Sequence, residues 1–186
     1  MPSIYIIAGC NGAGKTTAAY NLLPEVFKTI EFVNADEIAR GLSPLNPEGV
    51  AFHAARIMLE RLEDLKEKKK NFAFETTLSG LTYLKFIRAA KLKEYNITLF
   101  FIWLNNAKLA KERVAARVSK GGHNIPENVI ERRYAKGVNN FSKYFSLADD
   151  WYIYDNSGTE YTLVAKGIAG QADIFNFDVY NNLNTK

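Results

Sequence analysis

A chemically informative group of residues lies close to the start of the chain, in the segment Gly9-Cys10-Asn11-Gly12-Ala13-Gly14-Lys15-Thr16. Glycines in such a segment let backbone N–H groups wrap around an anion without interference from a Cβ atom. The spacing is that of a P-loop, in which Lys15 reaches the β- and γ-phosphates of a nucleotide and the Thr16 hydroxyl ligates Mg²⁺. The sequence therefore predicts a site for ATP with Mg²⁺.

The segments on either side of this loop fit a phosphate site. The run Ser3–Ala8 is β-branched and aromatic, as in a buried parallel strand, and we expect a helix over Lys15–Leu23 that stops before Pro24. The N-terminus of that helix would add a partial positive charge near the phosphates. We expect nucleotide contacts from Gly9, Asn11, Gly12, Ala13, Gly14, Lys15, Thr16 and Thr17, with a catalytic role for Lys15 as well.

Cys10 lies inside the loop and is the only cysteine of the chain. Neighbouring backbone amides could lower the pKa of its thiol and make the protein sensitive to thiol reagents. The alternative is that Cys10 is simply a small residue that fills a loop position. A single cysteine allows no intramolecular disulfide, so we expect a reducing, cytoplasmic location.

Three carboxylates follow predicted strands, as the P-loop does. Asp36 comes after a strand expected over Thr29–Val33, Glu75 after a strand over Phe72–Phe74, and Asp155 after a later strand. The carboxyl ends of parallel strands meet at one edge of a sheet, where ligands bind. We therefore expect all three carboxylates near the P-loop.

Asp36 is our candidate general base, because its position would bring the carboxylate within reach of an acceptor hydroxyl that faces the γ-phosphate. The alternative is that Asp36 caps the helix that follows it. Glu75 could bind an acceptor hydroxyl or order the waters of Mg²⁺. Alternatively, Glu75 caps the next helix together with Thr76 or Ser79.

Arginines are concentrated further along the chain. Arg113 and Arg117 are four residues apart and share one helix face, and Arg132 and Arg133 follow the break at Gly121-Gly122. Guanidinium groups match the negative charge that phosphoryl transfer spreads over the equatorial oxygens. We expect a lid over residues 107–135 in which Arg117, Arg113 and Arg132 act in catalysis. The alternative is a basic, solvated surface.

Strands that alternate with helices predict a sheet covered on both faces. The expected fold is α/β: a three-layer αβα P-loop kinase domain over residues 1–186, whose mainly parallel five-stranded sheet has the order 2-3-1-4-5 and an antiparallel edge hairpin. The Asn-rich tail is expected at the surface. The other expected elements are helices over 47–69, 81–95, 107–120 and 126–145, and strands over 97–104, 151–154 and 161–166. The buried face of the first of these helices is expected to hold Ala51, Ala55, Met58, Leu62 and Leu65.

The most hydrophobic expected strand ends in Asn105-Asn106, whereas motor and transporter ATPases place a carboxylate there. Carboxylates after the second and third strands are instead typical of small P-loop kinases. The motifs that carry a closer resemblance are the P-loop, Asn34-Ala35-Asp36, Phe74-Glu75-Thr76-Thr77, and the arginine-rich lid with Gly121-Gly122-His123. Over about residues 3–157 they resemble the zeta-toxin-type P-loop kinases.

This resemblance implies ATP-dependent phosphorylation of a hydroxyl group, UDP-N-acetylglucosamine being the family's known acceptor. We expect substrate contacts from Asp36, Glu75, Thr76 and His123, the last in place of a lid arginine. The alternative for His123 is a surface histidine in a flexible loop. A small-molecule acceptor and an antitoxin-like protein partner are the partners that we expect.

Composition leaves alternatives open. The chain has 186 residues, of which 47% are hydrophobic and 24% charged, as in a single globular domain. A formal net charge of +4 suits anionic partners but does not choose between nucleotides and nucleic acid. The alternatives are a kinase that acts on nucleic-acid ends, and a nucleotide-dependent switch or toxin-type effector that acts through a protein partner. The apolar run at the start is too short to cross a membrane, so we expect no membrane association.

Overall fold

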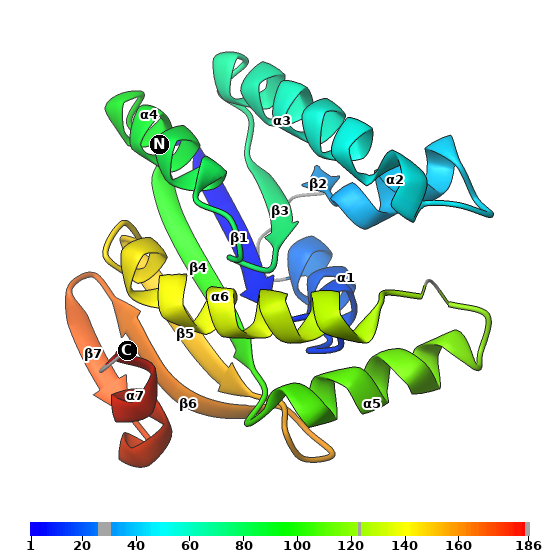
Figure 1. The fold of residues 1–186 in the computed structure, drawn as a ribbon. Coiled ribbons are helices and arrows are strands. Elements are labelled where there is room, and N and C mark those ends of the chain that lie inside the picture. The colour runs from blue at the N-terminus through cyan, green and yellow to red at the C-terminus, as the bar shows by residue number, and fades with distance from the viewer. Residues whose placement is uncertain (26–30, 123, 185–186) are drawn as a thin grey trace.

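Pairing between the apolar runs builds one sheet at the centre of the molecule (Figure 1). The computed structural model describes residues 1–25, 31–122 and 124–184. Within these residues, seven strands pair in the order β2-β3-β1-β4-β5-β6-β7. Their bounds are β1 Ser3–Gly9, β2 Phe32–Val33, β3 Phe72–Thr76, β4 Asn96–Trp103, β5 Asp150–Asp155, β6 Thr162–Ile168 and β7 Gln171–Ile174.

The first five strands are parallel, which confirms the predicted order 2-3-1-4-5. β1 is central, between β3 and β4, and Ile7 of β1 is in register with Glu75 of β3. Glu75 thus lies inside its strand, not after it as predicted. Ile7 comes two residues before Gly9, where the P-loop begins, so its register partner Glu75 lies beside the start of the loop.

An antiparallel edge extends the sheet. β6 pairs with β5, as predicted, and β7 pairs with β6. The turn between β6 and β7 consists of Ala169 and Gly170, with φ values of 51° and 81°, as in tight two-residue hairpins. The sequence prediction missed β7, because Gln171–Ile174 is largely exposed and shows no alternation of apolar residues.

Helices cover both faces of the sheet (Figure 1). Side chains of β1 alternate between two cores: Ile4 and Ile6 pack with residues of α3 and α4, and Ile7 packs with residues of α1 and α5. α6 contributes to both cores. The bounds are α1 Lys15–Glu25, α2 Ala35–Leu42, the 3-10 turn η1 Glu48–Val50, α3 Ala51–Glu67, α4 Thr82–Leu92, α5 Ala107–Val118, α6 Glu127–Phe145 and α7 Phe177–Asn184.

Some helix details differ from the prediction. α1 continues past Pro24 to Glu25, because the restriction that proline places on the preceding residue is a preference and helix ends shift by a residue or two. Ala51 is exposed and Ala54 is buried instead, since α3 begins only after η1 and this turns its first residues outward. Pro126 precedes α6 as its N-cap and is not part of its first turn.

The Asn-rich tail forms α7, in which Leu183 is buried and Tyr180 stacks on Trp151 with ring centroids 6.0 Å apart. The strand expected over Thr29–Val33 begins outside the described residues, and its last two residues form β2. None of the helices in the described ranges combines the length and the apolar character needed to cross a membrane.

Candidate functional site

The P-loop connects β1 to α1 in a conformation that requires glycine. Gly9, Gly12 and Gly14 have φ values of 146°, 78° and 89°. A Cβ atom added at Gly9 would lie 2.2 Å from the Ile102 carbonyl oxygen, and one added at Gly14 would lie 2.3 Å from the Tyr161 hydroxyl. The loop backbone is therefore packed closely against its neighbours, and a side chain would not fit at these two glycines.

Two residues that the sequence prediction missed hold this loop in place. Asn156 Nδ2 donates a hydrogen bond of 2.9 Å to the Ala13 carbonyl, and the Tyr161 hydroxyl donates one of 2.9 Å to the Gly14 carbonyl. Both residues come from the connection between β5 and β6. A signal for Asn156 was present, because it directly follows a strand that ends at the same edge of the sheet.

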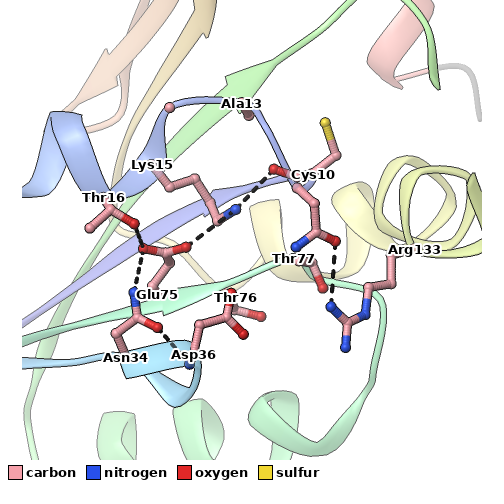
Figure 2. A network of polar contacts seen from close by, with 12 residues as sticks. Cys10, Ala13, Lys15, Thr16, Asn34, Asp36, Glu75, Thr76, Thr77 and Arg133 are labelled. Carbon is pink, nitrogen blue, oxygen red and sulfur yellow. Dashed lines mark hydrogen bonds and ion pairs between the residues drawn. The ribbon is translucent and has the colours of Figure 1, made fainter. Parts of the chain in front are cut away.

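Lys15 is buried, with only 5% of its side chain exposed, and two partners satisfy its ammonium group. Lys15 Nζ donates to the Cys10 carbonyl at 2.9 Å and lies 3.3 Å from Glu75 Oε1 (Figure 2). Glu75 Oε2 accepts hydrogen bonds from Thr16 Oγ1 at 2.7 Å and from Asn34 Nδ2 at 2.8 Å. One carboxylate therefore connects both functional side chains of the P-loop to the start of α2.

This placement excludes one of the roles considered for Glu75. The helix-cap alternative is wrong, because α4 has no side-chain cap and Glu75 faces the P-loop instead. The Thr16 hydroxyl and the Glu75 carboxylate are hard oxygen donors of the kind that Mg²⁺ takes. Within the described residues, no group of three or more His, Cys, Asp or Glu side chains is placed so that it could hold a metal ion by itself. Mg²⁺ in kinase-type sites needs only one or two carboxylates beside the phosphates, so these residues fit Mg²⁺ with a nucleotide.

Asp36 lies in the first turn of α2 and does not cap it. The cap is Asn34, whose Oδ1 accepts from the backbone N–H of Asp36 at 2.8 Å and of Glu37 at 3.4 Å. The N-cap alternative for Asp36 is therefore wrong. Asn34 was overlooked as a site residue, although its type and its place directly after β2 are those of an N-cap.

Asp36 borders two adjoining cavities. The first, of about 280 Å³, is lined by the P-loop, Asn34, Glu37, Arg40, Glu75, Arg113 and Arg117. The second, of about 400 Å³, lies between α2, α3 and the start of α6, and Phe52, Arg132 and Arg133 belong to its lining. A carboxylate at this position can face a ligand in either cavity.

The structure brings all four predicted lid arginines to these cavities. Arg113 Nη2 donates to the Gly158 carbonyl at 2.9 Å, and Arg133 Nη1 lies 3.5 Å from Asn11 Oδ1 in the P-loop. Arg117 lines the first cavity beside Arg113, and Arg132 lines the second.

Other predicted site residues are placed elsewhere. The Thr76 hydroxyl accepts from the Leu78 N–H at 3.1 Å, and Thr76 lines neither cavity. Asp155 accepts from the N–H and the hydroxyl of Ser157 and also lines neither cavity. His123 lies outside the described residues.

The Cys10 thiol does not have the reactivity considered for it. Burial raises its pKa to about 11, although the nearby Lys15 ammonium acts in the opposite direction. The thiolate is thus a small fraction at neutral pH, and the interpretation that remains is a small residue that fills the loop.

Comparisons with known proteins agree on the fold. The family model described as Zeta toxin matches residues 1–163. A protein of Haemophilus influenzae is 29% identical over 127 residues, which are 68% of this chain and 88% of that protein.

Solved structures share the fold of this chain. A chain of the crystal structure of AvrRxo1-ORF1:AvrRxo1-ORF2 with sulphate ions has a TM-score of 0.80 at 15% identity. The alignment covers 99% of this chain but only 64% of the AvrRxo1 chain. A chain of the PezAT toxin-antitoxin system of Streptococcus pneumoniae has a TM-score of 0.71 at 18% identity, over 89% of this chain and 72% of that one. Shikimate kinase from Acinetobacter baumannii has a TM-score of 0.52 at 18% identity, over 86% and 85%. At these identities the likeness is one of fold.

Replacement of Lys15 tests the nucleotide site. We expect Lys15→Ala to abolish ATP binding, because the phosphates lose their cation. It should also destabilise the fold by up to about 3 kcal/mol, since the buried Glu75 carboxylate keeps two donors but loses its counter-charge. Isothermal titration with ATP and Mg²⁺, run well below the melting temperature, measures the first effect, and thermal unfolding measures the second.

The double variant Lys15→Ala/Glu75→Gln separates the two effects. It removes the unpaired charge, so the melting temperature should rise toward that of the wild-type protein while ATP binding stays lost. Undiminished ATP binding by Lys15→Ala would contradict the P-loop assignment.

Proposed function

The chain belongs to the zeta toxin family, and we propose that it is an ATP-dependent kinase that moves the γ-phosphate of ATP to a hydroxyl group of a small molecule. The family and the fold support a P-loop kinase-like phosphotransferase. The observation that carries the proposal is the position of Asp36, which borders both the cavity over the P-loop and the second cavity beside it.

The first cavity suits the phosphate donor. Its floor is the glycine backbone of the P-loop, and Lys15, Arg113 and Arg117 supply positive charge to its lining. Thr16 and Glu75 would hold Mg²⁺, which when bound offsets the charge of the phosphate oxygens. Because the loop carbonyls of Ala13 and Gly14 already accept hydrogen bonds, the backbone is held rigidly for phosphate binding.

The second cavity suits the acceptor. Phe52 is 96% exposed beside it and offers an aromatic surface, with Ala55 and Val129 as further apolar lining. Arg132 and Arg133 line the same cavity and would bind an anionic group. An acceptor with a ring and a phosphate, such as a nucleotide sugar, combines these features.

Asp36 would connect the two halves of the reaction. Its carboxylate accepts the proton of the acceptor hydroxyl while the hydroxyl oxygen bonds to the γ-phosphorus. The bond between that phosphorus and the β–γ bridging oxygen breaks, and ADP is the leaving group. Arg117 and Arg113 would stabilise the charge on the transferring group from the donor side, and Arg132 from the acceptor side.

We also infer a protein partner. One similar structure contains AvrRxo1-ORF1 together with AvrRxo1-ORF2, and another comes from the PezAT toxin-antitoxin system. These relatives support an antitoxin-like partner for this chain. A partner of that kind would control the kinase and need not replace its activity.

A transfer screen tests the proposed function. The wild-type protein is incubated with γ-³²P-labelled ATP and Mg²⁺ against UDP-sugars, nucleosides, sugars and oligonucleotides. We expect label on a small molecule and none with Lys15→Ala. Label on oligonucleotides alone would favour a nucleic-acid-end kinase, and ATP binding without any transfer would favour a nucleotide-dependent switch.

Replacement of the proposed base gives a second test. Asp36→Asn should retain ATP binding and lose transfer by ~10² or more, the scale of general-base catalysis. Asn34 caps α2 in both proteins, so the melting temperature should change little. Transfer is measured with the acceptor found in the screen, and Asp64→Asn on the exposed side of α3 is the control. Transfer by Asp36→Asn at the rate of the control would remove Asp36 from the mechanism.

Residues 107–135 are proposed to close as a lid. Hydrogen exchange across residues 111–134 should slow when a non-hydrolysable ATP analogue and Mg²⁺ bind, because closure excludes water. Arg117→Ala should lower turnover by ~10³ and weaken ATP affinity far less. Arg88→Ala on α4 is the matched control. Exchange that does not respond, with normal turnover of Arg117→Ala, would leave this segment as an ordinary basic surface.

A further inference from the structure

Asn34 joins the P-loop side of the site to the helix that carries Asp36. Its Nδ2 donates to Glu75 Oε2 at 2.8 Å, and its Oδ1 accepts from the Asp36 N–H at 2.8 Å (Figure 2). The side chain is buried, with 6% of the residue exposed. Both ends of one amide are therefore in use, and rotation of this amide would change both contacts together.

The contacts of Glu75 make this link sensitive to the nucleotide. Besides Asn34, Glu75 interacts with Lys15 and with the Thr16 hydroxyl. These are the two groups that the proposed function assigns to phosphate and to Mg²⁺. A ligand that engages them competes with Glu75 for its partners, and the carboxylate would then depend more strongly on the Asn34 amide.

α2 is also placed to pass such a change to the acceptor side. It has only eight residues, too few to be stable alone, so its position depends on its cap and on its packing. Ala35, Asp36 and Ala39 of α2 line the second cavity together with Phe52 of α3. The orientation of the Asn34 amide thus bears on the shape of the acceptor cavity as well as on Asp36.

We propose that Asn34 is a positioning residue that couples occupancy of the P-loop to the placement of α2, and so of the Asp36 carboxylate. The inference rests on the proposed function, since it takes the ligand of the P-loop to be a nucleotide with Mg²⁺. It differs from a purely structural cap in one respect: the Asn34–Glu75 bond carries part of the response of α2 to the nucleotide, besides any direct contact with Glu37 or Arg40, which also line the first cavity.

Serine at position 34 separates coupling from capping. Asn34→Ser keeps a side-chain oxygen of a preferred N-cap type and loses the amide that reaches Glu75. Asn106 offers a matched control, because it caps α5 through Oδ1 with 2.8 Å to the Leu109 N–H, and its Nδ2 contacts Asn105. Asn106→Ser makes the same chemical change at a cap that has no contact with Glu75.

The measurement is hydrogen exchange of residues 35–42, with and without saturating adenylyl imidodiphosphate and Mg²⁺. In the wild-type protein and in Asn106→Ser, binding should slow exchange there on the order of threefold or more, as expected for local stabilisation of a short helix. In Asn34→Ser, exchange of the free protein should be close to wild type, and bound analogue should slow it clearly less than in wild type. Titration of each variant confirms that the analogue is bound.

Glu75→Ala is a second variant, which keeps the Asn34 cap and removes the acceptor of its amide, together with the partner of Lys15 and of the Thr16 hydroxyl. It should also show a reduced response of residues 35–42. Equal slowing in wild type and in either Asn34→Ser or Glu75→Ala would overturn the coupling role. Wild-type protein that binds the analogue with no change in α2 would overturn the coupling but not the proposed function, whereas wild type that fails to bind would overturn both.

Discussion

The site depends on one buried charge. Lys15 is held inside the P-loop away from water, and an ammonium group there needs an anionic partner. Glu75 supplies it, and the Thr16 hydroxyl and the Asn34 amide satisfy the second oxygen of that carboxylate. Three separate parts of the chain are fixed relative to one another as a result: the loop after β1, the end of β3, and the start of α2. A nucleotide that engages Lys15 and Thr16 would take over partners that Glu75 already holds.

The parallel sheet explains why the first and second cavities adjoin at Asp36. β1 and β3 are neighbours in register, so the P-loop and Glu75 meet at one edge, and β2 delivers α2 to the other side of β3. The two cavities differ in character. The donor side is polar and lined by the glycine loop, whereas Phe52 and alanines line much of the acceptor side. α3 and the start of α6 line only the second cavity, whereas the P-loop lines only the first.

Local signals in the sequence were sufficient for the P-loop, because a buried strand followed at once by a glycine-rich loop is a local pattern. The sheet order was predicted together with the fold class and not from local signals. They failed where tertiary contacts decide. Asp36 and Asn34 are both good cap residues, and only the three-dimensional structure shows that Asn34 has this role. The antiparallel pairing of β6 with β5 was predicted, but no local pattern reveals that Tyr161, just before β6, reaches the Gly14 carbonyl of the P-loop. β7 lacks apolar alternation because it is an exposed edge, and the pKa of Cys10 rises because burial outweighs the nearby positive charge.

The two hydrogen bonds that Asn156 and Tyr161 donate to the P-loop have a consequence for synthesis of the protein. Gly14 and Tyr161 are 147 residues apart in the chain, and Ala13 and Asn156 are 143 apart. A nascent chain on the ribosome that has exposed only β1 to β4 contains the complete loop sequence but not the residues that hold it. These two hydrogen bonds can form only after β5 and the connection to β6 have emerged. An incomplete product that ends before β5 carries the motif without the two side chains that donate to its backbone.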